Sequence, residues 1–243
     1  MTRATGSPFA MTVAVDIVLL AVKERKLSLL LIRRGIEPFR GRWALPGGAV
    51  LEHEDLDRAA ARELSEEAGV RAVYLEQFRA YGDPGRDPRG RVVSVAYVAL
   101  VRADQQVLAA ATDADAAAWF PIERLPELAF DHGAIVADAQ EHVRRALDRE
   151  PVGFQLLPRA FTLAALQAVH EAVLGKEIDK RNFRRKVLAE GLVVPVAGER
   201  EEGAHRPAQL HRFAHRAGPV PAATPAEAVA RKAARPSRKG RAR

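Results

Sequence analysis

The chain has 243 residues, a formal net charge of +7 and no cysteine. This length allows one medium and one small domain, each with a buried core. The lack of cysteine excludes disulfides and cysteine-based zinc sites, which fits a reducing compartment. No apolar run approaches the roughly 20 residues of a membrane helix, and no signal-peptide pattern is visible. We therefore expect a soluble, cytoplasmic protein with no membrane partner.

Positive charge is concentrated toward the C-terminal end. Lysines and arginines minus aspartates and glutamates give −3 for residues 1–150, +4 for 151–216 and +6 for 217–243. We expect these ranges to be a first domain, a second domain and a tail, and we expect any nucleic acid to meet the basic end. The tail is rich in alanine, proline and basic residues and should be disordered. It either adds salt-dependent DNA affinity or has no specific role.

The first 150 residues predict strands with helices packed on them. Apolar runs at 12–22 and 27–32, separated by a charged turn, indicate a hairpin. Further strands are expected at 72–81, 91–101 and 116–120. Apolar residues at helical spacing predict a helix over 134–147. Together these elements indicate an α+β domain in which helices cover a mixed sheet.

The segment 48–70, GAVLEHEDLDRAAARELSEEAGV, contains the most informative pattern. On a helix, Glu63, Glu66 and Glu67 share one face about one turn long, where like charges repel unless a cation binds. Hard carboxylate oxygens are the ligands that a divalent cation such as Mg²⁺ prefers. The opposite face carries an apolar stripe: Leu56, Ala60, Leu64 and Ala68. Three glutamates alone would fit an ordinary solvated helix equally well.

The joint spacing of Gly48, Glu54, Arg62 and the glutamates makes chance a poor explanation. The segment resembles the Nudix box at every fixed position, so the N-terminal part resembles a Nudix hydrolase. This resemblance implies that Glu63, Glu66 and Glu67 hold Mg²⁺ (or Mn²⁺), and that Glu54 orients Arg62 or reaches the metal through water. The cation would polarise a diphosphate and activate a water. An additional catalytic base remains open among Asp104, Asp113 and Asp115.

Several residues outside the helix are candidates for ligand binding. Gly47 and Gly48 allow close approach of a ligand to the backbone. In the loop 82–91 the arginines, Arg86, Arg89 and Arg91, either clamp a diphosphate or belong to a rigid turn with solvated side chains. Further ligand or dimer contacts are candidates near residue 40: Arg33, Arg34, Phe39, Arg40 and Trp43. His132, beside Asp131, is interpreted as structural.

The pattern of the second domain predicts a helix-turn-helix. Thr162 caps a helix that ends at Gly175, and Asp179 caps a second helix that ends at Gly191. The second helix has an apolar stripe of Phe183, Val187 and Leu188. Its remaining surface carries the candidate DNA-binding residues Lys180, Arg181, Asn182, Arg184, Arg185 and Lys186. Strands over 192–196 and 208–213 would flank a wing. The alternative is a solvated basic helix in an accessory domain.

Five stretches give a more specific resemblance: 37–48, 81–100, 129–132, 156–175 and 179–186. Together they resemble NrtR-type Nudix-related transcriptional regulators over roughly residues 10–215. The resemblance implies an N-terminal Nudix α/β/α sandwich followed by a small winged helix-turn-helix domain. It also implies a homodimer that senses ADP-ribose or a related NAD metabolite and binds double-stranded operator DNA to repress genes of NAD metabolism.

Three functions from different classes follow from these patterns. The chain is a metabolite-responsive repressor, a Mg²⁺-dependent Nudix pyrophosphohydrolase that converts ADP-ribose to AMP and ribose 5-phosphate, or a protein that does both. The basic helix favours the first and third. The box is intact in this sequence, whereas regulators of this kind often carry degraded boxes, so hydrolysis is permitted.

Overall fold

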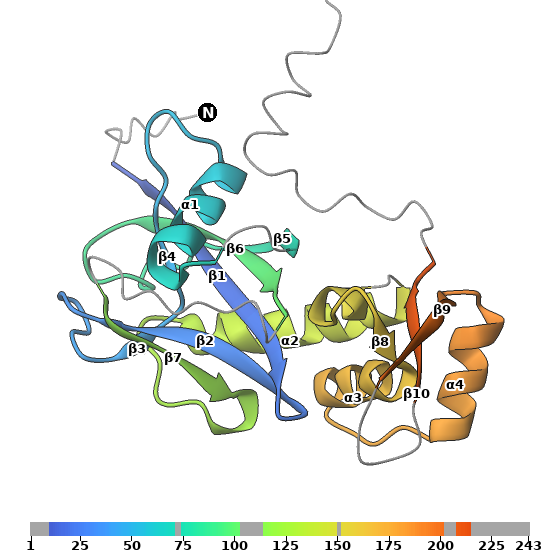
Figure 1. Ribbon diagram of the computed structural model, residues 1–243. Helices are drawn as coiled ribbons and strands as arrows, with labels where there is room; N and C mark the ends of the chain where they lie inside the picture. Colours follow the sequence, from blue (N-terminus) through green and yellow to red (C-terminus); the bar gives the residue numbers. More distant parts are fainter. Residues whose placement is uncertain (1–9, 71–73, 103–113, 150–151, 202–207, 215–243) are drawn as a thin grey trace, which may run out of the picture.

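The computed structural model describes residues 10–70, 74–102, 114–149, 152–201 and 208–214. A mixed sheet with α1 on one side and α2 on the other forms the first part (Figure 1). A smaller unit built from α3, α4 and a second sheet follows it. This architecture confirms the predicted α+β class and the winged helix after the sandwich.

Within the described residues, seven strands form the first sheet. They are β1 (Thr12–Lys23), β2 (Lys26–Arg34), β3 (Trp43–Ala44), β4 (Gly47–Ala49), β5 (Tyr74–Tyr81), β6 (Val92–Leu100) and β7 (Ala114–Pro121). The main path runs β3-β2-β1-β6-β5, with β4 paired to β1 and β7 to β2. Only the pairing of β1 with β6 is parallel among these strands. The predicted hairpin and the three later strands are therefore present.

Strand β1 is buried on both faces, which explains its continuous apolar run. Val18 and Leu20 point into one core with α2, while Ile17 and Leu19 point into the other core with α1. A strand covered by helices on both faces has no solvent side that needs polar residues. This double burial places β1 at the centre of the sandwich.

Local hydrogen bonds explain where the two helices of the first domain begin and where α1 ends. Helix α1 (Leu56–Ala68) is capped by Asp55, whose carboxylate accepts from the Arg58 N–H at 2.9 Å, and it ends at Gly69 with a φ of 63°. Helix α2 (His132–Arg149) begins two residues before the predicted start. The Asp131 carbonyl accepts from the N–H groups of Ala134 and Ile135, so the first turn precedes the apolar periodicity. The short 3₁₀ helix η2 (Ile122–Arg124) lies before α2.

The winged helix follows the predicted order. Its elements are η3 (Val152–Leu156), β8 (Phe161–Thr162), α3 (Leu163–Leu174), α4 (Lys180–Ala189), β9 (Val193–Glu201) and β10 (Ala208–Phe213). Thr162 Oγ1 accepts from the Ala165 N–H at 3.1 Å, and an Asp179 carboxylate oxygen accepts from the Asn182 N–H at 2.8 Å. Both predicted caps are therefore confirmed. The short strand β8 was not predicted; it pairs with β10 to make a three-stranded sheet.

One predicted core position of α4 is wrong. Phe183 and Val187 are buried, but Leu188 is 50% exposed. Residues four apart share a helix face, whereas the next residue is rotated by about 100°. The buried stripe therefore contains Phe183 and Val187 only.

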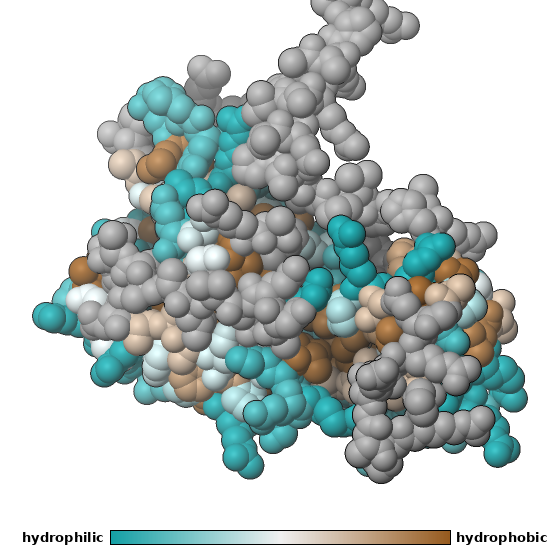
Figure 2. Space-filling model, viewed as in Figure 1, coloured by the Kyte–Doolittle hydropathy of each residue, from teal (hydrophilic) through white to brown (hydrophobic). Residues whose placement is uncertain are grey.

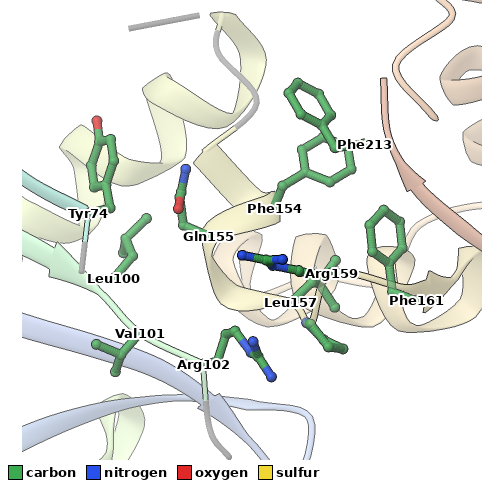
Figure 3. Close-up of a pocket in the computed structure, with 11 residues that line it drawn as sticks. Tyr74, Leu100, Val101, Arg102, Phe154, Gln155, Leu157, Arg159, Phe161 and Phe213 are labelled. Carbon is green, nitrogen blue, oxygen red and sulfur yellow. The ribbon is translucent and has the colours of Figure 1, made fainter. Parts of the chain in front are cut away.

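The two parts share one continuous core. Buried residues of the sheet, such as Leu20 and Leu29, belong to the same cluster as Leu166 and Phe183 of the winged helix. Near this junction the Phe154 ring packs against the Phe213 ring, with centroids 4.4 Å apart (Figure 3). The domain limits at 150/151 and 216/217 stay predictions, because both lie outside the described residues, as does the tail 217–243. No helix in the described part of the chain is long and apolar enough to cross a membrane.

Candidate functional site

Helix α1 brings the predicted acidic cluster together around one arginine. Arg62 binds Glu54 through two nitrogens, with its Nε 3.0 Å and its Nη2 2.6 Å from the two carboxylate oxygens. Its Nη1 lies 2.7 Å from Glu63 Oε1 and 3.2 Å from Glu66 Oε2. The structure thus unites four of the five residues that the sequence predicted as catalytic.

The glycine turn before α1 holds the remaining glutamate and leaves room for Glu63. Glu67 Oε2 accepts from the Gly47 N–H at 2.8 Å. A Cβ atom on Gly48 would lie 2.2 Å from Glu63 Oε1, which is well inside van der Waals contact. Position 48 therefore requires glycine, because the Glu63 carboxylate packs directly against the backbone there.

Burial and ion pairing shift the pKa values of the carboxyl groups in this cluster in opposite directions. Burial raises the pKa of Glu63, although the Arg62 guanidinium opposes this effect. The same guanidinium lowers the pKa of Glu54 through its hydrogen bonds. Arg62 itself has a raised pKa, first because of its bond to Glu54. A nearby cation stabilises the ionised form of a buried carboxyl group whose pKa is raised. The cluster therefore favours binding of a cation.

The donor set suits a hard divalent cation, since Glu63, Glu66 and Glu67 offer only carboxylate oxygens. Across the part of the chain that the structure describes, no three acidic or histidine side chains converge on a preformed metal centre. Arg62 instead forms ion pairs with Glu63 and Glu66. A cation bound here would have to replace the Arg62 contacts to these two carboxylates.

A cavity of about 700 Å³ opens beside the cluster. Glu63 and Glu67 line one part of it. Arg34, Arg89 and Arg91 line another, and the apolar wall includes Ile36 and Phe130. Carboxylates for a cation, guanidinium groups for phosphate and an aromatic wall for a flat ring make this cavity suited to a nucleoside diphosphate.

The predicted ligand residues divide into two groups. Gly47, Gly48 and Arg89 line the cavity. Arg33, Arg40 and Arg86 are absent from the residues that line it. Arg33 instead donates from Nε to the Gly41 carbonyl at 3.1 Å, and Arg40 is exposed. The ligand roles of all six residues stay predictions.

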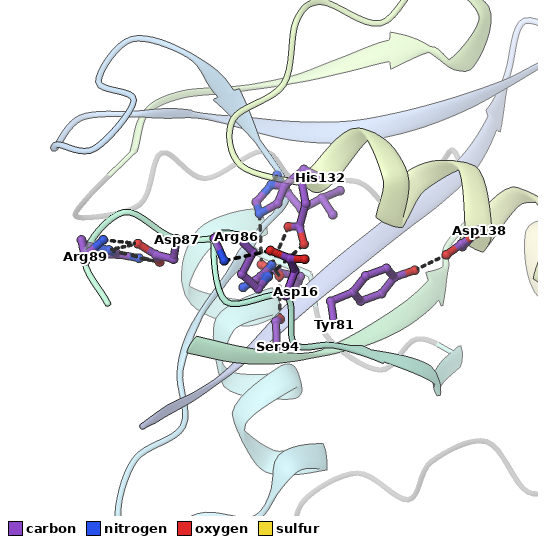
Figure 4. Close-up of polar contacts among 12 residues, drawn as sticks. Asp16, Tyr81, Arg86, Asp87, Arg89, Ser94, His132 and Asp138 are labelled. Atoms are coloured by element: carbon purple, nitrogen blue, oxygen red, sulfur yellow. Dashed lines mark hydrogen bonds and ion pairs between the residues drawn. The ribbon is translucent and has the colours of Figure 1, made fainter. Parts of the chain in front are cut away.

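Arg86 lies in a buried ion-pair network, which is drawn in Figure 4. Its side chain is 4% exposed. It contacts Asp131 through two bonds of 2.7 and 2.9 Å, and Asp16 at 3.0 Å. Ser94 Oγ donates to the same Asp16 oxygen at 2.6 Å. These bonds fasten the loop 82–91 to the sheet and favour the rigid-turn interpretation for Arg86.

Arg89 of the same loop has a different environment. Its side chain is 55% exposed and forms a bidentate pair with Asp87, with a shortest distance of 2.6 Å. Hydrogen bonds from Arg89 lower the pKa of Asp87. The rigid turn thus presents Arg89 at the cavity and leaves it accessible to an anion.

His132 completes the network at the cavity wall. It is buried, and its Nδ1 accepts from the Leu45 N–H at 2.9 Å, which leaves the proton on Nε2. Nε2 lies 3.4 Å from Asp16 Oδ1. Burial lowers the pKa of His132, so the neutral ring is favoured. The ring thus accepts a backbone hydrogen bond at one nitrogen and lies beside the Asp16 carboxylate with the other.

Phe130, to which the sequence analysis gave no ligand role, lines the cavity together with two arginines that it named as candidates, Arg34 and, in the loop 82–91, Arg91. The Arg34 guanidinium carbon lies 4.8 Å from the centroid of the Phe130 ring, and its Nε donates to the Pro38 carbonyl at 2.7 Å. Its Nη2 is buried without a hydrogen-bond partner. An unpaired buried guanidinium nitrogen is a signal that only the structure provides.

The three candidates for an additional base stay predictions. Asp104 and Asp113 lie outside the described residues, and Asp115 lies in β7. The choice among them stays open.

Helix α4 carries the second predicted site. Five of the six candidate residues are exposed: Lys180, Arg181, Asn182, Arg185 and Lys186. Arg184 is half-buried, and its Nε is buried without a hydrogen-bond partner. The outer lower edge of this domain, where α4 begins in Figure 1, is hydrophilic in Figure 2. The helix therefore presents a cationic surface that could follow a phosphate backbone.

Comparison with known proteins agrees with this two-part arrangement. The NUDIX domain model matches residues 10–139, and the model of the NrtR DNA-binding winged helix domain matches residues 153–213. The ADPR responsive transcriptional repressor NtrR of Acinetobacter baylyi is 36% identical over 206 residues, which cover 82% of this chain and 81% of the relative.

Two further relatives represent the whole chain and the first domain. The crystal structure of Shewanella oneidensis NrtR complexed with a 27mer DNA has a TM-score of 0.72 and 34% identity, covering 83% of this chain and 93% of that one. The ADP-ribose pyrophosphatase of Methanocaldococcus jannaschii is 40% identical over 126 residues, 52% of this chain and 71% of the relative. Nudix hydrolases generally use a divalent metal. The chain thus belongs to the Nudix family, in the group whose Nudix domain is followed by an NrtR winged helix domain.

Proposed function

We propose that the protein is an ADP-ribose-responsive transcriptional repressor of genes of NAD metabolism. One observation carries the proposal: a single chain joins a domain with a nucleotide-sized cavity, through a shared core, to a winged helix with an exposed cationic helix. The Acinetobacter baylyi relative is named as an ADPR-responsive repressor, and the Shewanella oneidensis relative is a DNA complex. A repressor of this kind acts on DNA in the cytoplasm.

Different residues in and beside the cavity would bind different parts of the ligand. Glu63, Glu66 and Glu67 would hold Mg²⁺, which supplies positive charge beside the diphosphate. Arg34 and Arg89 approach the phosphates as bidentate donors. The Phe130 ring and Ile36 provide an apolar wall for a flat base. The ligand in this assignment is ADP-ribose or a closely related NAD metabolite.

Helix α4 would enter the major groove. Asn182 and Arg185, which are hydrogen-bonded to each other at 2.7 Å, would meet base edges. Lys180, Arg181 and Lys186 would contact phosphates. A homodimer would place two such helices on successive half-sites about one helical turn apart. The ligand releases DNA if it binds more tightly to an arrangement in which this spacing is lost.

Hydrolysis is the second candidate function, and the intact Nudix box favours it. Arg62, Glu63, Glu66 and Glu67 are all present, and the Methanocaldococcus jannaschii relative is an ADP-ribose pyrophosphatase. The metal, when bound, would polarise the diphosphate and lower the pKa of an attacking water. Glu54 holds Arg62 in place through two hydrogen bonds and so positions the carboxylates around it.

A fluorescence-anisotropy titration tests both functions. The full chain is titrated onto its own upstream promoter DNA with and without ADP-ribose and Mg²⁺, and the mixtures are then separated by chromatography to detect AMP. The repressor function predicts specific binding that ADP-ribose weakens. Equal binding to promoter and unrelated DNA of the same length would refute it, and AMP formation alone would leave an ordinary hydrolase.

Matched variants assign each activity to its residues. Arg181→Ala with Arg185→Ala should remove promoter binding and leave any hydrolysis unchanged. Glu66→Gln should remove Mg²⁺-dependent AMP release and leave promoter binding in the absence of ligand intact. Arg145→Ala removes an exposed arginine of α2 and serves as the control for loss of an arginine outside α4.

A further inference from the structure

A second cavity, of about 280 Å³, lies between the two domains and is separate from the nucleotide cavity. Leu100 and Arg102 close it on the side of the Nudix sheet. Phe154, Arg159 and Phe213 close it on the side of the winged helix. Figure 3 shows the Arg159 guanidinium directed from the winged helix toward Leu100. The two cavities share no lining residue.

The charge of this second cavity points to an anion. Arg102 and Arg159 line it from opposite domains, and none of the described residues that line it is acidic. Arg159 is exposed and makes no hydrogen bond or ion pair with any described residue. Most arginines around the nucleotide cavity are paired with aspartate, glutamate or a carbonyl; Arg159 keeps its donors available for a ligand.

The apolar part of the wall points to a flat ring. Phe154 packs against Phe161 and Phe213, with ring centroids 5.4 and 4.4 Å apart. This aromatic cluster lies beside the Arg159 guanidinium, while the exposed Gln155 amide offers one further polar group (Figure 3). Aromatic rings next to a guanidinium bind planar ligands that carry one negative group.

Size limits the ligand further. Pockets for drug-sized ligands enclose about 300–1,000 Å³, so a cavity of about 280 Å³ suits one ring with a small substituent. We infer that this interdomain cavity is a second effector site for a compact aromatic anion, a single flat ring bearing a carboxylate or a phosphate. The anionic group binds Arg159, the Arg102 side chain adds positive charge on the opposite wall, and the ring lies against the phenylalanine cluster.

Occupancy of this site has a consequence for the domain arrangement. Its walls come from β5, β6 and the residues directly after β6 on one side, and from η3, the segment between η3 and β8, β8 and β10 on the other. A ligand that contacts both walls stabilises the domain arrangement that brings the walls together, by a free energy that grows with the ratio of ligand concentration to Kd. The site is therefore a route by which a second small molecule adjusts the DNA-binding domain without entering the nucleotide cavity.

Ligand-observed ¹⁹F NMR on the full chain tests the inference, with 4-fluorobenzoate, 4-fluorophenyl phosphate and neutral 4-fluorobenzyl alcohol as probes and no divalent cation present. We expect saturable binding of at least one anionic probe and at least tenfold weaker binding of the alcohol. Preference between the two anions distinguishes a carboxylate ligand from a phosphate ligand. Inorganic phosphate alone should compete at least tenfold more weakly than the aromatic anion, because it lacks the ring.

Three variants locate the binding. Arg159→Ala should weaken the anionic probe at least tenfold, Arg159→Lys should recover part of that loss, and Arg145→Ala should bind as the parent does. Because Arg159 is exposed, unfolding midpoints of its variants should match the parent. Equal binding by Arg159→Ala, non-saturable binding, or a loss that appears only in Arg89→Ala would overturn the inference. The last result would place the probe in the nucleotide cavity.

Discussion

The Arg25 guanidinium lies 3.0 Å from the Glu171 carboxylate, and this ion pair joins the tip of the β1–β2 hairpin to helix α3. The other carboxylate oxygen of Glu171 accepts from the Gln167 amide at 2.8 Å and from the Ile178 N–H at 3.2 Å. The Gln167 and Ile178 bonds, together with the Arg25 charge, lower the pKa of Glu171. One carboxylate thus holds the turn of the helix-turn-helix and contacts the Nudix domain.

Removing Glu171 should lower the free energy of unfolding more than removing Arg25 does. Glu171→Ala removes the acceptor of the Ile178 N–H and should lower the free energy of unfolding by about 1–2 kcal/mol. Arg25→Ala should change it by less than about 0.5 kcal/mol, because the Arg25 side chain is 71% exposed and solvent screens the pair. Urea denaturation of both variants measures the difference. Equal losses would show that the ion pair, and not the turn, is the main role of Glu171.

Gly48 should be intolerant of even the smallest side chain. In Gly48→Ala the new methyl group would overlap the Glu63 carboxylate, so Glu63 must move away from the face proposed to bind metal. We expect a stability loss of about 1–3 kcal/mol and at least tenfold weaker Mn²⁺ binding, measured by urea denaturation and calorimetry.

The matched control for Gly48 is Gly133→Ala in the first turn of α2. A Cβ atom there meets nothing within 4 Å, and alanine is the better helix former. This variant should be neutral or more stable by up to about 1 kcal/mol, with unchanged Mn²⁺ binding. Equal Mn²⁺ affinity in the Gly48 variant and the control would show that the close approach of Glu63 to Gly48 is not needed for the metal.

Local signals account for what the sequence predicted well. The α1 cluster depends on spacing within one helix, and the caps Thr162 and Asp179 each bond to an N–H three residues ahead. Such interactions need no knowledge of the fold. Leu188 was assigned to the core by apolarity alone, and its direction on the helix makes it exposed. The strand β8 has two residues and exists only because β10 returns beside it.

Non-local packing accounts for what the sequence did not reveal. Arg34 and Arg91 were separate candidates on distant segments, and only the folded cavity brings them together with Phe130. Arg86 and Arg89 are three residues apart in one loop, yet one is buried in an aspartate network and the other is accessible. Residue type could not separate them, because the distinction comes from Asp16 and Asp131, far away in the chain.

Buried His132 should make stability fall in mild acid. Burial lowers its pKa below the usual value near 6.5, so the folded protein binds fewer protons here than the unfolded chain. The contribution of neutral His132 to the free energy of unfolding is fully present above pH 6.5. It is lost as the pH falls from 6.5 toward the lowered pKa of the folded state. The slope from this one group approaches about 1.4 kcal/mol per pH unit.

Unfolding measured between pH 5 and 8 tests the role of His132. His132→Asn retains an acceptor for the Leu45 N–H but cannot titrate, so the decline below pH 6.5 should become shallower. His142→Asn is the control, because that histidine is partly exposed beside Glu76. The same slope in parent and His132→Asn would show that another group causes the acid sensitivity.

The two kinds of DNA contact on α4 should separate by salt dependence and by base preference. Lys186 is exposed and would contact phosphate, so Lys186→Ala should weaken promoter and unrelated DNA alike and reduce the slope of log affinity against log salt by about 1. Asn182→Ala and Arg185→Ala should each reduce discrimination between promoter and unrelated DNA by about 1–3 kcal/mol.

Because Asn182 and Arg185 are hydrogen-bonded to each other, the effects of their two substitutions on discrimination should not be additive. Because Arg185 Nη2 donates to Asn182 Oδ1 at 2.7 Å, each residue orients the other before DNA arrives. The double variant should therefore lose less discrimination than the two single losses added together. Anisotropy titrations with promoter and unrelated DNA at four salt concentrations give both quantities. Additive losses would mean that the two side chains separate on binding and read their bases independently.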